Sequence, residues 1–230
     1  REVNGKEPLF FGSNKELKVH PLSVTTNGLL GSDCTVACGD MVFIVHIPLP
    51  GIHRLYNTLA AVAAGYVLGL NEKEMAAGIE AIKATPGRGN VIKTDKLTIL
   101  DDCYNANPVS MEAAIDLLTL SDHRKVAILG DMFELGEEER YLHEGVGKYA
   151  VKKETDVIYC IGDLGKSIYE GAVSEAGRGD EEGKILIRHF KDKEEFFRRL
   201  DSLLMKEDAV LVKASHGMHF EEIVDRLVKW

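Results

Sequence analysis

The sequence lacks two glycine-rich signatures by which nucleotide-binding domains are commonly identified. Neither a Gly-x-x-x-x-Gly-Lys-Ser/Thr phosphate loop nor a Gly-x-Gly-x-x-Gly dinucleotide fingerprint occurs in its 230 residues. The nearest run is Gly162-Asp163-Leu164-Gly165-Lys166-Ser167, which has two residues between its glycines where a phosphate loop has four. We interpret this run as a tight strand-to-helix turn, and the missing fingerprint disfavours a dehydrogenase.

Cys-x-x-Cys pairs, long apolar runs and excess positive charge are also missing. The cysteines Cys34, Cys38, Cys103 and Cys160 form no Cys-x-x-Cys pair, so the sequence indicates no zinc site, and a reducing, cytoplasmic location is expected. No apolar stretch is long enough to span a membrane. The net charge of -9 disfavours partners such as nucleic acid or an anionic membrane.

The first part of the chain predicts a small antiparallel sheet followed by two helices. Short β-like runs at 9–12, 36–38 and 41–47 are separated by turn sequences. The first helix is expected over 52–68 and is apolar nearly all round, so it should be buried. The second begins at Asn71. The chain begins at Arg1 in what reads as a connection, so we expect a fragment with a partial first domain over 1–87.

From residue 88 onward, strands alternate with helices. The proline and two glycines of 86–89 mark the expected boundary between domains 1–87 and 88–230. Strands are predicted at 97–100, 126–129, 157–161, 185–187 and 209–212, and helices at 109–120, 138–151, 166–176, 193–204 and 220–228. This order predicts an α/β domain with a Rossmann-like, mostly parallel sheet and helices on both faces.

Charged residues follow several of these predicted strands. Asp101 and Asp102 end the first strand, Asp131 and Asp163 follow the second and third, and Lys213 ends the last. The carboxyl ends of parallel strands share one edge, where open α/β sheets bind ligands. A lysine after a buried strand needs a partner, and a carboxylate or phosphate is the natural one.

The stretch 100–111 joins the first of these strands to its helix. Asn107 is placed to cap the helix and Pro108 to be its first residue. Asp102, Tyr104 and Asn105 are not needed for such a turn, which favours a functional role. A structural hydrogen-bonding role for one of the two aspartates is the alternative.

A second candidate loop is Leu129-Gly130-Asp131-Met132-Phe133-Glu134-Leu135-Gly136. Two carboxylates beside two apolar residues suit a partly apolar ligand with a positive amine. His143, on the following helix, is open to two interpretations, facing the site or facing solvent. His216 and His219 have no third ligand nearby in sequence and do not indicate a metal.

Four stretches of the chain resemble the Mur ligases: 51–61, 100–111, 129–136 and 212–218. The resemblance implies the end of a central ATPase domain, over 1–87, followed by the whole third domain. It also implies ATP-dependent joining of D-alanyl-D-alanine to UDP-N-acetylmuramoyl-tripeptide in peptidoglycan synthesis, through an acyl phosphate and with Mg²⁺. The phosphate loop and most magnesium ligands would precede Arg1, so the chain alone is expected to be inactive.

The resemblance also implies roles for individual residues. It assigns Lys213 and Asn105 to catalysis. It assigns the nucleotide to His53, Asn57, Arg88, Asp102 and Tyr104, with the ribose hydroxyls on Asp102. It assigns the substrate side to Asn107, Asp131, Glu134, Ser215 and His143, with Ser215 and Lys213 taking the carboxylate of D-alanyl-D-alanine. Arg54 departs from the family, which usually has asparagine there, so adenine recognition is expected to differ.

Two other functions remain compatible with the residues. One is a free-standing Rossmann-like module that binds a small molecule and carries a β-rich arm. The other is a different amino-acid ligase of the Mur superfamily, such as a folylpolyglutamate ligase. The run Asp-Asp-Cys-Tyr-Asn-Ala-Asn-Pro at 101–108 argues against the second.

Overall fold

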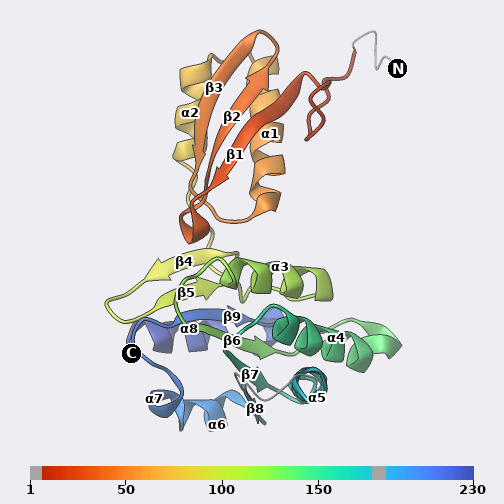
Figure 1. Ribbon diagram of the computed structural model, residues 1–230, viewed down its shortest axis with the longest axis vertical. Coiled ribbons are helices and arrows are strands. Elements are labelled where there is room, and N and C mark those ends of the chain that lie inside the picture. Colours follow the sequence, from red (N-terminus) through yellow and green to blue (C-terminus); the bar gives the residue numbers. More distant parts are fainter. Residues whose placement is uncertain (1–6, 178–184) are drawn as a thin grey trace. The chain divides into compact units, whose positions relative to one another are not determined.

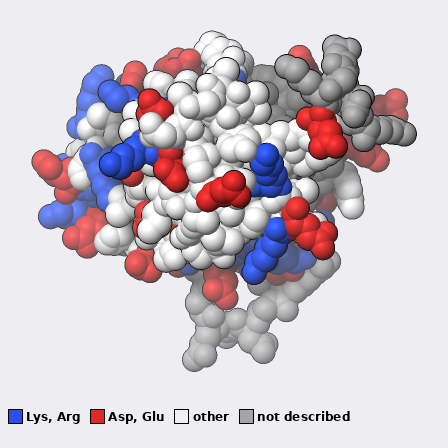
Figure 2. All heavy atoms as spheres, turned by 90° about the horizontal axis from the view of Figure 1, so that it is seen from above, with Lys and Arg blue, Asp and Glu red and all other residues white. Residues whose placement is uncertain are grey.

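The computed structural model describes residues 7–177 and 185–230, and the chain divides into two compact units, Arg1–Lys83 and Ala84–Trp230 (Figure 1). Among the described residues, no helix combines the length and apolar character needed to cross a bilayer. On the face drawn in Figure 2, acidic and basic side chains are interspersed around uncharged surface, without a field of one sign.

The first unit is a three-stranded antiparallel sheet with two helices packed on it. Strands β1 (Val19–Thr26), β2 (Ser32–Cys38) and β3 (Met41–Ile47) lie in that order. Helices α1 (Ile52–Val67) and α2 (Glu72–Glu80) share one buried core with the sheet (Figure 1). The predicted small sheet with two helices is therefore confirmed.

Two details of this unit differ from the prediction. The run 9–12 is not a strand, since Phe11 only forms an isolated bridge with Val19. The first strand is β1, which the sequence did not predict because it contains Pro21. Pro21 is tolerated because β1 is an edge strand and its pairing with β2 shifts register between Pro21 and Ser23.

The composition of helix α1 had predicted burial on all sides, but only one side of the helix is buried. Leu59 and Val62 are fully buried against the sheet, whereas Ile52, Val67 and Leu68 are about 70% exposed or more. The described elements packed on α1 are α2 and the three strands, and these cover a single face. An apolar helix circumference therefore did not predict complete burial here.

The second unit is a six-stranded sheet in the order β4-β5-β9-β6-β7-β8. Strand β4 is antiparallel to β5, and the other neighbouring strands are parallel. The strands are β4 (Asn90–Lys93), β5 (Thr98–Asp101), β6 (Lys125–Gly130), β7 (Val157–Ile161), β8 (Leu186–Phe190) and β9 (Ala209–Lys213). The predicted mostly parallel sheet is confirmed, with β4 as an unpredicted antiparallel edge strand.

Helices cover both faces of this sheet, as predicted. One face packs α3 (Pro108–Leu118), α4 (Glu139–Lys152) and α5 (Gly165–Ala176), which contact one another in sequence order. The other face carries α6 (Lys193–Phe197), α7 (Leu200–Leu203) and α8 (Glu221–Val228). Alternate strand residues such as Val126 and Ile128 join Phe196 and Phe220 in that second core.

The boundaries of some elements differ from the prediction. The single helix expected over 193–204 is two short helices, α6 and α7, and the strand expected at 185–187 extends as β8 to Phe190. Asn107 caps α3 through Ser110, with Pro108 in the first turn, as the sequence predicted.

Candidate functional site

The carboxyl ends of the parallel strands bring four loops to one edge of the sheet. Asp101 pairs in register with Val212, and Leu129 pairs with Lys213. Gly130 pairs with Ile161 on the next strand. The loops that begin at residues 102, 131, 162 and 214 therefore leave the sheet side by side, as the alternation of elements predicted.

Lys213 ties two of these loops together. Its Nζ donates to Asp102 Oδ2 at 2.5 Å and to the carbonyl oxygen of Asn105 at 2.9 Å. The lysine side chain is 2% exposed, and that of Asp102 is 24% exposed. The partner that the sequence required for this lysine is thus a carboxylate of the same chain, on a side chain that is partly accessible.

The remaining residues of the 101–107 segment have structural partners. Asp101 is buried and accepts hydrogen bonds from the Gly87 N–H at 2.7 Å and from the Cys103 thiol at 3.1 Å. Asn105 is exposed, and its side chain accepts from the Ala106 N–H. The alternative of a structural role for one aspartate therefore describes Asp101, whereas Asp102 faces the edge.

Arg88, Tyr104 and His216 stack beside this loop. The Arg88 guanidinium lies 4.0 Å from the centre of the Tyr104 ring. The centres of the Tyr104 and His216 rings are 5.3 Å apart. The aromatic pair borders a pocket of about 450 Å³ that also includes Asp101 and Val224. Gly87, at φ +76°, lets the chain approach Tyr104, since an added Cβ would lie 3.1 Å from the Tyr104 Cβ.

Asp131 is buried at the end of β6 and anchors the neighbouring turn. Its Oδ1 accepts from the Gly165 N–H at 2.6 Å, at the start of α5. Burial raises the pKa of this carboxyl above its ordinary value, although hydrogen bonds from Gly165 and Leu164 oppose the shift. Gly162, at φ +108°, leaves room for the carboxylate, which an added Cβ would meet at 2.4 Å. The glycine run 162–167 is thus a tight strand-to-helix turn.

His143 and Ser215 are both buried and both bind the loop that follows β6. The Met132 N–H donates to His143 Nε2 at 2.8 Å, and the Phe133 N–H donates to Ser215 Oγ at 2.8 Å. Burial lowers the pKa of His143 below its ordinary value. Of the two positions left open for His143, the structure places it inside the fold, beneath the loop.

Glu134 and Phe133 lie on the outer side of the same loop. Glu134 is exposed and adopts φ +63°, a left-handed conformation that is uncommon for residues other than glycine. The Phe133 side chain is 43% exposed. These two residues are available to a ligand at the sheet edge, whereas the side chains beneath them are not.

A pocket of about 390 Å³ lies next to this loop, and the sequence had not predicted all of its residues. Asp131, Asp163 and Met218 line it together with Lys191 and Lys193. Both lysines follow β8, so the rule that placed Asp131 and Lys213 at this edge could have found them. They were overlooked because the strand was predicted to end at residue 187, whereas β8 ends at Phe190, next to Lys191.

The first unit contains the other nucleotide candidates. His53, Arg54 and Asn57 lie on α1, with Asn57 exposed and Arg54 half-buried. The side chain of His53 lies outside what the structure describes. All other predicted site residues belong to the second unit.

Neither a metal cluster nor a reactive thiol is found at the site. Within 7–177 and 185–230, no group of three or more His, Cys, Asp or Glu side chains is arranged to hold a metal ion. The four cysteines are buried and unpaired. Burial raises the pKa of Cys34 to about 11 and also raises the pKa of Cys103 and of Cys160. Burial therefore disfavours the reactive thiolate form of these three cysteines.

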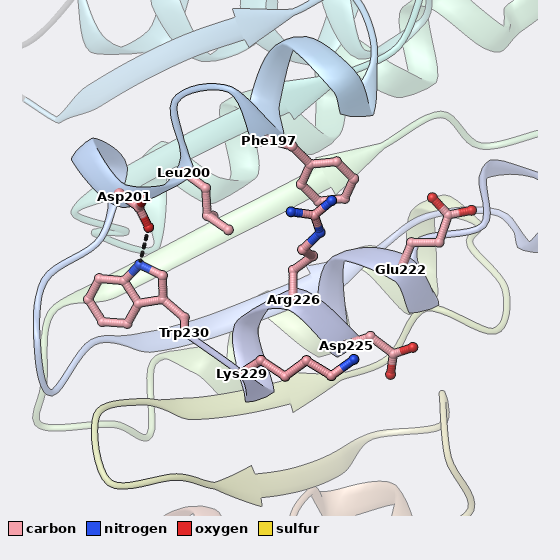
Figure 3. Close-up of a pocket in the computed structure, with 8 residues that line it drawn as sticks. All are labelled: Phe197, Leu200, Asp201, Glu222, Asp225, Arg226, Lys229 and Trp230. Carbon is pink, nitrogen blue, oxygen red and sulfur yellow. Dashed lines mark hydrogen bonds between the residues drawn. The ribbon is translucent and has the colours of Figure 1, made fainter.

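A larger pocket, of about 620 Å³, lies between α7 and α8 (Figure 3). Trp230 closes one side by donating from its indole nitrogen to Asp201 at 3.1 Å, and the Arg226 guanidinium lies over the Phe197 ring. Lys96, which precedes β5, donates to the Trp230 carbonyl. The pocket therefore runs along α8, from Glu222 to Trp230 just beyond the helix, and it includes none of the predicted site residues.

Comparison with known proteins gives consistent relatives. Residues 87–216 match the family described as Mur ligase, glutamate ligase domain. The chain is 37% identical over 186 residues to the UDP-N-acetylmuramoyl-tripeptide–D-alanyl-D-alanine ligase of Bacillus subtilis, covering 80% of this chain and 39% of that protein. It is 32% identical over 218 residues to the enzyme of the same name from Escherichia coli, covering 94% and 45%.

Solved structures agree with these relatives. MurF from Acinetobacter baumannii superposes with a TM-score of 0.84 at 25% identity, covering 94% of this chain and 46% of that one. MurF ligase from Thermotoga maritima in complex with ADP gives a TM-score of 0.74 at 25% identity, covering 96% and 48%. The chain spans less than half the length of these relatives. Because the family match extends over more than half of its residues, the chain belongs to the Mur ligase family.

Proposed function

We propose that this chain is the carboxyl-terminal part of an ATP-dependent ligase of peptidoglycan synthesis that joins D-alanyl-D-alanine to UDP-N-acetylmuramoyl-tripeptide. The observation that carries the proposal is the convergence of four loops at one sheet edge, two of them tied together by Lys213, in a chain whose named relatives are ligases of this type. That edge offers carboxylates, a lysine hydrogen-bonded to the neighbouring loop, and exposed apolar surface, all within one unit.

In the proposed reaction, the tripeptide carboxylate attacks the γ-phosphorus of ATP, which forms an acyl phosphate and releases ADP. The amine of D-alanyl-D-alanine then attacks the acyl carbon, forming the amide and releasing inorganic phosphate. Such chemistry depends mainly on positioning and on stabilising charge. Magnesium would neutralise the ATP phosphates. We assign no magnesium ligand to the described residues, because they contain no metal cluster.

The second unit would contribute to nucleotide binding through three residues. Asp102, whose side chain is 24% exposed, would offer its second carboxylate oxygen to the ribose hydroxyls, while Lys213 holds Oδ2 in place. Arg88, stacked on Tyr104, would meet the phosphates. His53 and Asn57 keep their assignment to the nucleotide as predictions.

The same edge would bind D-alanyl-D-alanine. The residues predicted for that side are Asn107, Asp131, Glu134, Ser215 and His143, with Lys213 and Asn105 predicted to act in catalysis. Direct contact is best supported for Glu134, which is exposed. Lys213 would act chiefly by holding Asp102 and the Asn105 carbonyl in place, since it is buried and already bonded to both.

The test is ADP release by the complete protein, purified and supplied with ATP, magnesium, UDP-N-acetylmuramoyl-tripeptide and D-alanyl-D-alanine. We expect release to require all of them and to stop when L-alanyl-L-alanine replaces the D-dipeptide. Equal or faster release with a single amino acid such as glutamate would instead identify another ligase of the superfamily. Binding of the dipeptide without any release would favour a binding module.

A further inference from the structure

The loop formed by residues 131–134 is held from below by side chains of two other elements. It leaves β6 and belongs to no helix or strand, so its backbone N–H groups need partners from elsewhere. The Met132 N–H finds His143 on α4, and the Phe133 N–H finds Ser215 after β9, each at 2.8 Å. Two successive donors are thus satisfied by two buried side chains.

We propose that His143 and Ser215 are positioning residues, which hold the 131–134 loop so that Phe133 and Glu134 face D-alanyl-D-alanine. This inference rests on the proposed function for the identity of the ligand. It revises the expectation that His143 and Ser215 bind the substrate themselves.

His143 has no ring atom left for a ligand. The side chain is completely buried, Nε2 accepts from the Met132 N–H, and Nδ1 lies 2.6 Å from the Glu139 carbonyl oxygen. A carbonyl oxygen only accepts and an amide N–H only donates, so these partners fix the neutral ring with its proton on Nδ1. The ring therefore links α4 to the loop in one defined protonation state.

Ser215 is joined to the loop twice. Its Oγ accepts from the Phe133 N–H, and its own N–H donates to the Asp131 carbonyl oxygen at 2.9 Å. The side chain is only 2% exposed. The segment after β9 and the loop after β6 are consequently fixed to each other by paired hydrogen bonds, beneath the surface that a ligand would reach.

The outer residues of the loop need this support. Glu134 has φ +63°, and such left-handed conformations persist in residues other than glycine only where the surroundings hold them. The Phe133 ring lies over Gly217, where an added Cβ would come within 3.0 Å of it. Loss of either anchor should therefore release Phe133 and Glu134 together.

The anchoring is tested by amide hydrogen exchange in this chain. In His143→Leu the Met132 amide should exchange about tenfold faster, and in Ser215→Ala the Phe133 amide should do the same, because each loses one buried hydrogen bond. His143→Gln and Ser215→Thr keep an acceptor and should restore protection. Ser167→Ala, at another buried serine on α5, is the control. Unchanged exchange in both disrupting variants would overturn the proposal.

The link to substrate is tested by kinetics of the complete protein. Ser215→Ala should raise KM for D-alanyl-D-alanine about tenfold and leave KM for ATP unchanged, again as one lost hydrogen bond. When Phe133 and Glu134 are both alanine, adding Ser215→Ala should cause little further change, because the serine acts through them.

Two outcomes would count against this link. Multiplying effects in the combined variant would show that Ser215 contacts the substrate directly and would overturn the positioning role. A complete protein without D-alanyl-D-alanine-dependent activity would instead overturn the proposed function, while the exchange experiment would still decide whether the loop is anchored.

Discussion

An ion pair with one buried and one partly exposed partner lies at each end of the parallel strands, and the two pairs are built differently. At the amino ends of the strands, Arg124 donates to both oxygens of Asp208 at 2.7 and 2.6 Å. Asp208 is 1% exposed and also accepts from the Met205 N–H. At the carboxyl ends, Lys213 donates to only one carboxylate oxygen of Asp102, Oδ2, and the Asp102 side chain is 24% exposed.

This difference in geometry and exposure indicates that Arg124–Asp208 is a structural ion pair, whereas Lys213–Asp102 supports a binding site. The planar guanidinium of Arg124 saturates its carboxylate and leaves little for any other partner. The ammonium of Lys213 binds one carboxylate oxygen and a loop carbonyl, so it fixes two loops while the Asp102 side chain stays partly exposed. We expect the amino edge to contribute stability and the carboxyl edge to contribute both stability and binding.

The largest effect is expected from Arg124→Met. It leaves the almost completely buried Asp208 carboxylate without its cation, which should lower the free energy of unfolding of the second unit by about 4 kcal/mol. Urea denaturation measures this loss. Arg124→Lys keeps the charge but not the bidentate geometry and should cost about 1 kcal/mol. A loss below about 1 kcal/mol in Arg124→Met would remove the contrast between the two edges.

Lys213→Met should cost less stability, about 2 kcal/mol, because water can reach the Asp102 carboxylate that remains. The double variant with Asp102→Asn should recover part of that loss, since no charge is then left without its partner. The same denaturation series measures both variants. If Lys213→Met costs as much as Arg124→Met, Asp102 is as fully desolvated as Asp208 and the proposed accessible oxygen does not exist.

Removing the cap of α3 should have a smaller effect. Asn107→Ala loses the side-chain hydrogen bond to the Ser110 N–H and should lower the free energy of unfolding by about 1 kcal/mol. Asn107→Asp keeps the cap and should keep the stability. A dipeptide KM that rises in Asn107→Asp despite normal stability would show a contact with substrate beyond capping.

His143 should give the smallest effect, seen as a pH dependence. Burial holds its pKa below the ordinary value of 6.5, against the opposing charges of Asp131 and Glu139, so the unfolded chain binds the proton more readily. Stability should therefore fall as the pH is lowered through 6.5, until the folded protein is protonated too, by on the order of 1 kcal/mol or less. Denaturation at pH 7.5 and 5.5 measures the change, and His143→Gln should remove this component.

The sequence predicted the second unit well because the order of its strands and helices determines how the strands pair. Strands that alternate with helices require parallel pairing, and parallel pairing puts residues 102, 131 and 213 at one edge whatever the loops do. The contact between Asp102 and Lys213 also requires β5 and β9 to be neighbours, a strand order that the sequence did not predict. The partner type was predicted as well, as a carboxylate or a phosphate, but not that this chain would supply it.

Other features depend on tertiary contacts that spacing does not encode. Strand β1 was missed because Pro21 is acceptable only at an edge with a register shift, and β4 because four residues carry too weak a pattern. The roles of His143 and Ser215 depend on where two backbone N–H groups point. The hydrogen-bond partners of His143 and Ser215 could be identified only from the conformation of the loop after β6.

The most direct measurement of the central claim compares Lys213→Met with Arg124→Lys in the complete protein, using ADP release dependent on D-alanyl-D-alanine at a temperature where both remain folded. A site at the carboxyl edge predicts that Lys213→Met loses at least about 90% of kcat/KM for the dipeptide, whereas Arg124→Lys keeps nearly all of it. Equal losses in the two variants, or full activity in Lys213→Met, would contradict it.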